Sequence, residues 1–159
     1  GQALAVAGAA AAVRAQARQL LSRLPGRTHE DLLVVLDAEP RERWATVLRE
    51  EVLRIVDLPV RQRSVIVEGF LDGALARPGA SYDLVESLLQ VVIELPPGGY
   101  GLLVGAIEDA CADRPGQDTE RLRAVIASVM ARFALPQWQR LAASLNAVAQ
   151  EAGRPATWT

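Results

Sequence analysis

A repeated leucine-proline pair restricts the folds open to this chain. It occurs three times at nearly regular intervals, at Leu58-Pro59, Leu95-Pro96 and Leu135-Pro136. An Arg-Pro pair follows each leucine at one constant distance, beginning at Arg77, Arg114 and Arg154. Proline is tolerated in the first turn of a helix and excluded from its interior, so these pairs predict where helices start and end. The repeated unit is therefore expected to be a helical hairpin.

The segment before each Leu-Pro pair carries apolar residues at positions i, i+4 and i+8. These triplets are Leu48-Val52-Val56, Val85-Leu89-Ile93 and Val125-Val129-Phe133. This spacing places three side chains on one face of a helix. We expect the central members, Val52, Leu89 and Val129, to be buried at equivalent places in successive hairpins. We also expect the three prolines to lie in first helical turns.

These patterns predict an all-α fold with about eight helices in stacked antiparallel hairpins, as a short α-solenoid or an irregular bundle. The helices are expected near residues 3–23, 28–37, 40–56, 59–76, 81–94, 97–113, 119–133 and 136–152. We expect one domain over residues 1–159, with an Ala/Arg-rich helix at 1–23, a degraded repeat at 24–57, and repeats at 58–94, 95–134 and 135–159. Because the chain begins with Gly1 and its only methionine is Met130, we expect it to be a piece of a longer protein.

Composition bears on the possible partners. Half of the residues are apolar and 23% are charged, which is typical of a globular domain. The longest apolar run, from Ala3 to Val13, is short and rich in alanine, which argues against a membrane anchor. The net charge of −2 argues against a nucleic-acid partner for the domain as a whole. All 17 basic residues are arginine, so the chain is lysine-free.

Residues suited to catalysis are scarce. The single cysteine, Cys111, takes the place of Ala74 in the preceding repeat and is expected to be a small core residue. The single histidine, His29, is expected to be solvated in a first helical turn. Adjacent acids such as Glu108-Asp109 point in different directions on a helix and are expected to be solvated. We therefore predict no catalytic residue, no metal site and no cofactor.

Polar residues at the helix ends have a structural interpretation. Ser81 and Thr119 are placed where helix N-caps are wanted. The three arginines of the Arg-Pro pairs lie in last turns, where they are expected to neutralise the helix dipole and its free carbonyls. These residues are therefore assigned to the fold and not to a binding site.

The Leu-Pro opening, the buried i, i+4, i+8 face and a hairpin repeat of about 40 residues resemble the HEAT and armadillo class of α-repeats. Within that class, the chain is most similar to the divergent repeats of secreted effectors from bacterial pathogens. The resemblance covers roughly residues 24–155. It implies a bacterial scaffold that binds other macromolecules, and it supplies no catalytic residue.

One edge of the predicted stack departs from the repeat. Arg61-Gln62-Arg63 and Trp138-Gln139-Arg140 occupy matching places after two Leu-Pro pairs, whereas the middle repeat has Gly98-Gly99-Tyr100. Two glycines weaken a helix start, so this edge is expected to be a close approach of a neighbouring backbone, a binding surface with Tyr100 as its exposed anchor, or an irregular turn. The predicted partner-binding residues are Arg61, Arg63, Tyr100, Trp138 and Arg140.

The sequence therefore predicts a non-catalytic module that binds another protein, located in the cytoplasm or, for a secreted effector, in a host cell. It leaves the oligomeric state and the identity of the partner open. Two alternatives remain. The first is an anion-binding module that docks on nucleic acid or acidic lipid through an arginine edge. The second is a helical-bundle enzyme or ligand-binding domain with an apolar pocket.

Overall fold

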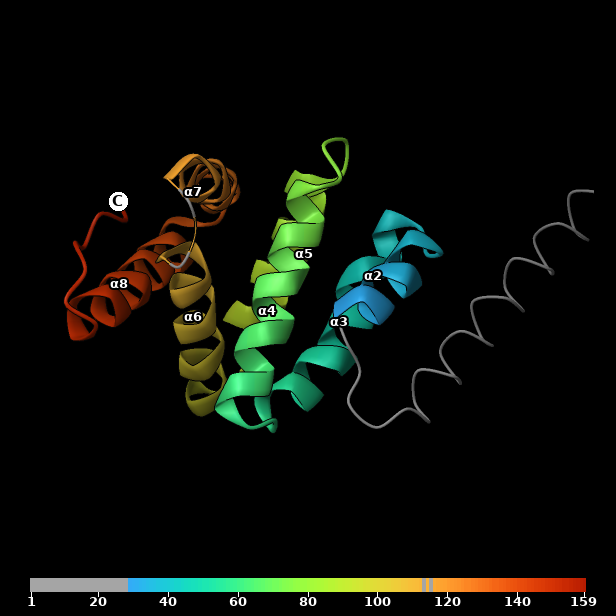
Figure 1. Ribbon diagram of the computed structural model, residues 1–159, viewed down its shortest axis with the longest axis horizontal. Coiled ribbons are helices and arrows are strands. Elements are labelled where there is room, and N and C mark those ends of the chain that lie inside the picture. Colours follow the sequence, from blue (N-terminus) through green and yellow to red (C-terminus); the bar gives the residue numbers. More distant parts are fainter. Residues whose placement is uncertain (1–28, 113, 115) are drawn as a thin grey trace, which may run out of the picture.

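The computed structural model describes residues 29–112, 114 and 116–159, and this part of the chain folds into helices without a strand. The helices are α2 (His29–Asp37), α3 (Arg41–Val56), α4 (Val60–Leu75), α5 (Ser81–Ile93), α6 (Pro97–Ala112), α7 (Gly116–Met130) and α8 (Leu135–Glu151) (Figure 1). The all-α prediction is confirmed for these residues. The helix expected over 3–23 lies outside them. Among the seven described helices, α7 differs most from its predicted bounds. It begins and ends three residues before the predicted positions 119 and 133.

Helices that are next but one in the chain pack side by side. One layer contains α2, α4, α6 and α8, and the other contains α3, α5 and α7. Short connections lead from one layer to the other, so consecutive helices form hairpins that stack along the molecule (Figure 1). Each helix in the middle of the stack therefore contacts the other layer and two neighbours in its own layer.

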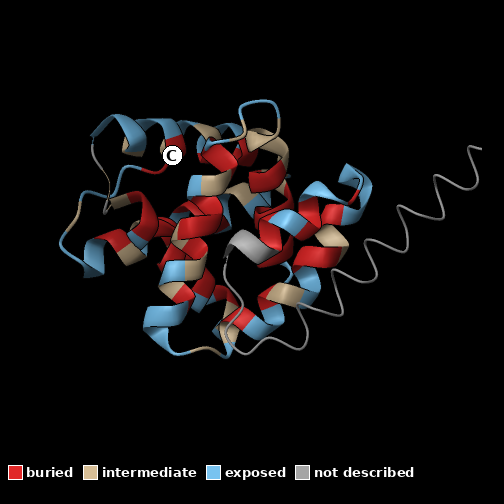
Figure 2. Cartoon of the chain, turned by 45° about the vertical axis from the view of Figure 1, so that its right-hand side comes forward, coloured by how far each residue is buried: buried red, intermediate tan, exposed pale blue. Residues whose placement is uncertain are grey.

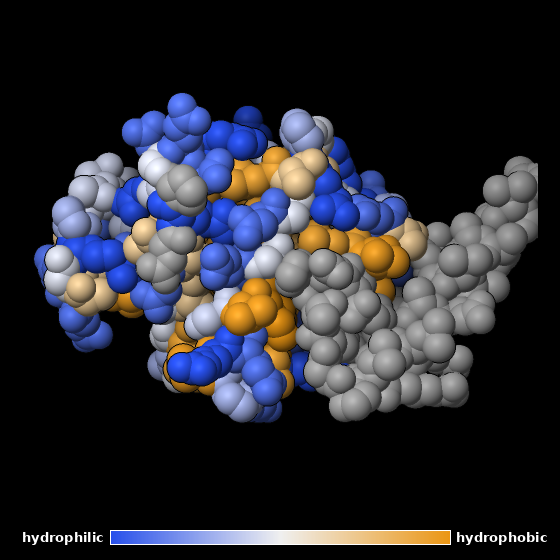
Figure 3. All heavy atoms as spheres, in the orientation of Figure 1, coloured by the Kyte–Doolittle hydropathy of each residue, from blue (hydrophilic) through white to orange (hydrophobic). Residues whose placement is uncertain are grey.

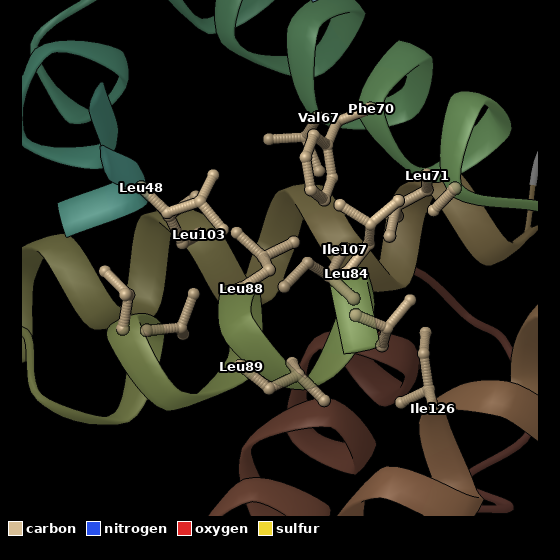
Figure 4. Close-up of a cluster of buried hydrophobic side chains, with 14 of the residues drawn as sticks. Leu48, Val67, Phe70, Leu71, Leu84, Leu88, Leu89, Leu103, Ile107 and Ile126 are labelled. Atoms are coloured by element: carbon tan, nitrogen blue, oxygen red, sulfur yellow. The ribbon is translucent and has the colours of Figure 1, made fainter. Parts of the chain in front are cut away.

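The core lies between the two layers. Figure 4 shows Leu88 of α5 close to Leu103 and Ile107 of α6, and each of these three side chains is at most 4% exposed. Buried residues gather on the facing sides of the helices, whereas exposed residues lie on the outer sides (Figure 2). The apolar spacing read from the sequence is therefore explained by burial of one face of each helix.

The structure corrects the register of the last hairpin. Equivalent backbone bonds end α5 and α7, from Glu94 N to Val91 O and from Arg132 N to Val129 O. These bonds make Arg132 the counterpart of Glu94, whereas the Leu-Pro pairs would match Glu94 to Ala134. Val129 is therefore the counterpart of Val91, and not of Leu89 as the sequence predicted. The predicted burial of Val52, Leu89 and Val129 is confirmed.

The prolines explain the difference in register. Pro59 is the N-cap of α4 and Pro96 directly precedes α6, whereas Pro136 lies inside the first turn of α8. The expectation of three first-turn prolines is therefore wrong for Pro59 and Pro96. Because proline is accepted at all of these positions, it marks a helix start without defining its register.

The two predicted N-cap residues cap the preceding helices instead. The hydroxyl of Ser81 lies 2.6 Å from the carbonyl oxygen of Ala74 and 2.9 Å from that of Arg77. The hydroxyl of Thr119 donates in the same way to the carbonyl oxygen of Cys111, at 3.0 Å. Both side chains satisfy carbonyls that the last turn of a helix leaves free.

Ion pairs connect successive helices of the α2–α4–α6–α8 layer. Each arginine of an Arg-Pro pair contacts an aspartate of the preceding helix in this layer: Arg77 contacts Asp37, Arg114 contacts Asp72, and Arg154 contacts Asp109. Two of these arginines also donate to the carbonyl four residues earlier, as expected for a role at a helix end. The repeated Arg-Pro pair therefore positions neighbouring hairpins in addition to ending a helix.

Candidate interaction surface

The predicted edge divides into buried and accessible residues. Arg63 is 8% exposed, and its guanidinium donates to the carbonyl oxygens of Val56 and Leu58 at the end of α3. This arginine therefore satisfies free helix-end carbonyls. The prediction that Arg63 is available to a partner is wrong, because its side chain caps the end of the neighbouring helix α3.

Tyr100 is also buried, with 6% of its surface exposed. Its hydroxyl donates to Ser144 Oγ at 2.8 Å, and the Arg140 guanidinium lies 3.8 Å from the centre of its ring. Arg140 in turn donates to the carbonyl oxygen of Ile93 at the end of α5. Tyr100 of α6 occupies the position that Arg63 holds on α4. Arg140 of α8 therefore caps the end of α5, in the way that Arg63 caps the end of α3. Tyr100 is therefore an internal connection between α6 and α8, not the exposed anchor that we predicted.

The other three predicted residues are more accessible. Arg61 in the first turn of α4 is exposed, and so is Arg140 on α8, despite its contact with Tyr100. Trp138 is half-buried against the core. The structure thus joins Tyr100 to Arg140 and leaves Arg61 on another helix, so the five residues do not form one continuous surface.

A different surface follows from the corrected register. Val65 of α4 and Leu102 of α6 occupy matching positions and are 62% and 44% exposed. In the corrected register, Arg140 is their counterpart on α8. We call the exposed side of α4, α6 and α8 around these three residues the outer face. In Figure 3, hydrophobic atoms interrupt the polar surface over α4 and α6.

Three glycines of α6 flatten the outer face. A Cβ atom built on Gly98, Gly101 or Gly105 would meet no heavy atom within 4 Å. By contrast, a Cβ on Gly73 of α4 would collide with the side chain of Leu33 of α2. Gly73 therefore permits two helices to approach, whereas packing within the described chain does not explain the three glycines of α6. Glycine in a helix costs about 1 kcal/mol relative to alanine, so these positions carry an unexplained loss of stability.

We predict opposite effects when alanine replaces glycine on these two helices. Gly101→Ala and Gly105→Ala should each raise the free energy of unfolding by up to about 1 kcal/mol, because alanine favours the helix and meets open space. Gly73→Ala should lower it, because Leu33 must move. Urea unfolding followed by circular dichroism measures all three. A loss of stability in both α6 variants would contradict the finding that no atom lies near a Cβ built on Gly101 or Gly105.

Cys111 lies in the core, as its match to Ala74 predicted. Its side chain is fully buried and unpaired. Burial, with a smaller contribution from the charge of Glu108, raises the pKa of the thiol to about 12. The thiol is therefore protonated at neutral pH and is not a nucleophile there.

This burial predicts the reactivity of the thiol. In the native protein at pH 8, Cys111 should react with a thiol reagent far more slowly than in urea, because the thiol is both inaccessible and protonated. Cys111→Ala should be folded, because the preceding repeat has Ala74 at this place. The measurement is the time course of labelling by mass spectrometry, with the urea-unfolded protein as control. Equal native and unfolded rates would show that this face of α6 is not buried.

Glu108 is the residue that the sequence interpretation misjudged most. It was expected to be solvated beside Asp109, yet it is 1% exposed. The register explains why, since Glu108 occupies the core position held by Leu71 one hairpin earlier. Matching Glu108 to Leu71 in the sequence repeat could have revealed this buried charge. Its partners are the indole of Trp158 and the guanidinium groups of Arg123 and Arg154.

Other kinds of site lack support in the described residues. Among them, no group of three His, Cys, Asp or Glu side chains is placed to hold a metal ion. Of His29 only the backbone position, at the start of α2, is described. Within the same ranges, no helix has the length and apolar character to cross a membrane. No family model, curated protein or solved structure matches this chain.

Proposed function

We propose that this chain is a non-catalytic module that binds another protein through its outer face, as part of a larger bacterial protein. The likeness of its stacked hairpins to HEAT and armadillo repeats supports this proposal, because repeats of this class present a continuous surface formed by equivalent positions. The row of Val65, Leu102 and Arg140 on α4, α6 and α8 is a surface of this kind.

The observation that carries the proposal is the combination of Leu102 with its glycine neighbours. Leu102 is 44% exposed on α6, while Gly101 and Gly105 beside it have open space where their side chains would be. A flat apolar strip of this kind allows a partner backbone to approach closely, which would offset the cost of glycine in the helix. A protein is the partner we favour, because the centre of the strip is uncharged and Arg61 and Arg140 lie on the flanking helices.

A photo-crosslinking amino acid placed at Leu102 tests this function. In cells that produce the protein, it should give one dominant cross-linked species that protease removes and nuclease does not. The same amino acid at Gln90, an exposed position of α5 in the other layer, is the matched control and should not give this species. The additional change Val65→Asp should abolish the product without loss of helical signal.

A nuclease-sensitive product would favour the anion-binding alternative instead. Equal products from Leu102 and Gln90 would mean that the outer face has no special role. Either result would reject the proposed function, because each assigns the contact to another kind of partner or to another surface.

A further inference from the structure

Residues 154–159, which we call the strap, follow α8 and form neither helix nor strand. Gly153, with φ of 73°, ends α8 in the left-handed conformation that glycine adopts without strain. The backbone N–H of Arg154 donates to the carbonyl oxygen of Ala149 at 2.8 Å, which completes this helix end. The chain then turns back, so the strap contacts side chains of α6, α7 and α8.

Trp158 is the centre of the strap. Its side chain is 6% exposed, and the indole N–H donates to Glu108 Oε2 of α6 at 2.7 Å. The guanidinium of Arg123, on α7, lies 4.1 Å from the ring centre. The indole is therefore held at its edge by a carboxylate and on its face by a cation, two contacts that favour tryptophan over other aromatic residues.

Asn146 of α8 binds the backbone at the same residue. Its side-chain oxygen accepts from the backbone N–H of Trp158 at 2.8 Å, and its amide donates to the carbonyl oxygen of Trp158 at 2.7 Å. This paired contact resembles the one that a neighbouring β-strand makes with an extended chain. Asn146 therefore recognises an extended backbone, whatever its sequence, while Glu108 and Arg123 recognise the indole.

Glu108 is expensive to bury for stability alone. The preceding hairpin has Leu71 at this position, and an apolar residue at such a site is often as stable as an ion pair or more so. Besides Trp158, the carboxylate has Arg123 at 3.8 Å and Arg154 at 3.6 Å. Two of these three partners belong to the strap, so the buried charge is matched to the strap and not to the helical core.

The rest of the strap is accessible to solvent. Pro155, Ala156, Thr157 and Thr159 are exposed. Beside the strap lies a groove of about 350 Å³, lined on the α7 side mainly by Ala124, Ala127 and Met130. The strap is connected to the helices through Arg154, Trp158 and the hydroxyl of Thr157, which accepts from Arg123, so it could leave this site while the helices stay packed.

We propose that α6, α7 and α8 form a binding site for an extended protein segment that carries a tryptophan and, four residues before it, an arginine. In this structure, the strap occupies the site as an internal ligand. The arginine of the ligand pairs with Asp109, as Arg154 does at 2.8 Å, and its indole donates to Glu108. A partner with this chemistry displaces the strap. This site is independent of the outer face and of the function proposed for it.

The test uses the full chain and a fluorescent peptide with the strap sequence Arg-Pro-Ala-Thr-Trp-Thr. The peptide should bind the Trp158→Ala chain and should bind the wild-type chain about ten-fold more weakly, because its own Trp158 competes. Adding Asn146→Ala to the Trp158→Ala chain should remove binding. A peptide with 1-methyltryptophan, which lacks the indole N–H, should bind about ten-fold more weakly, because Glu108 then loses its donor.

A second readout covers the case in which Trp158→Ala unfolds the chain. Saturating peptide should raise the thermal midpoint of this variant, because a ligand stabilises the state that it binds. Absence of binding together with an unchanged midpoint would overturn the proposal. Equal affinity for the wild-type and Trp158→Ala chains, or for the 1-methyltryptophan peptide and its parent, would overturn it as well, because the peptide would then be bound elsewhere or by apolar contact alone.

Discussion

Leu89→Ala should lower the free energy of unfolding by about 2–5 kcal/mol, because it removes a large side chain from the centre of the core and leaves a cavity. Leu89 is 1% exposed on α5, the helix that lies between α3 and α7 in its layer. Because Leu89 belongs to the buried core cluster, the site has little freedom to collapse around a smaller residue. Urea unfolding followed by circular dichroism measures the change.

The adjacent residue provides the control. Gln90 is exposed on the same helix, so Gln90→Ala should change the free energy of unfolding by no more than about 0.5 kcal/mol. Similar losses from both variants would mean that α5 does not present the face that the structure assigns to the core. A loss below about 1 kcal/mol for Leu89→Ala would lead to the same conclusion.

The fold was largely predictable from local patterns. The spacing of apolar residues follows from which face of a helix is buried. The placement of proline follows from the hydrogen bonds of the helix itself, so both patterns can be read from the sequence. The burial of Val52, Leu89 and Val129 follows from these two rules. The register of the last hairpin does not, because Pro136 is as acceptable inside the first turn of α8 as Pro59 is before α4.

The candidate surface was less predictable, because long polar side chains near helix ends can point toward solvent or turn back. Arg63 and Tyr100 turn back, the first to carbonyls of its own hairpin and the second to Ser144. Sequence spacing places both residues on an edge but leaves the direction of their side chains undetermined. The exposed row from Val65 to Arg140 became visible only when the structure corrected the register of α8.

The burial of Glu108, by contrast, could have been predicted from the sequence repeat, although its acidic neighbour Asp109 suggested a solvated position. An acidic residue beside another acidic residue is usually solvated, yet the match to Leu71 one repeat earlier indicates a core position. The partners of this carboxylate could not be foreseen, because Trp158 lies 50 residues away and is brought back by the turn at Gly153.

Tyr100→Ala should lower the free energy of unfolding by about 3–5 kcal/mol, the usual cost of removing a buried aromatic ring. The ring is 6% exposed and lies under the guanidinium of Arg140, so its loss leaves a cavity between α6 and α8. Tyr100→Phe keeps the ring and removes only the hydroxyl that donates to Ser144, which should cost about 1 kcal/mol. Thermal and urea unfolding of both variants give these values.

The comparison between the two variants decides whether Tyr100 serves the fold or a partner. A buried ring predicts that the alanine variant is far less stable than both the phenylalanine variant and Ser144→Ala on α8, because these two remove polar groups and keep the ring. An exposed anchor would instead leave the stability of all three variants near that of the wild type. Since Arg140 lies over this ring, a large loss in Tyr100→Ala should also speed the hydrogen exchange of the α8 backbone amides from Trp138 onward, which are hydrogen-bonded in the native helix.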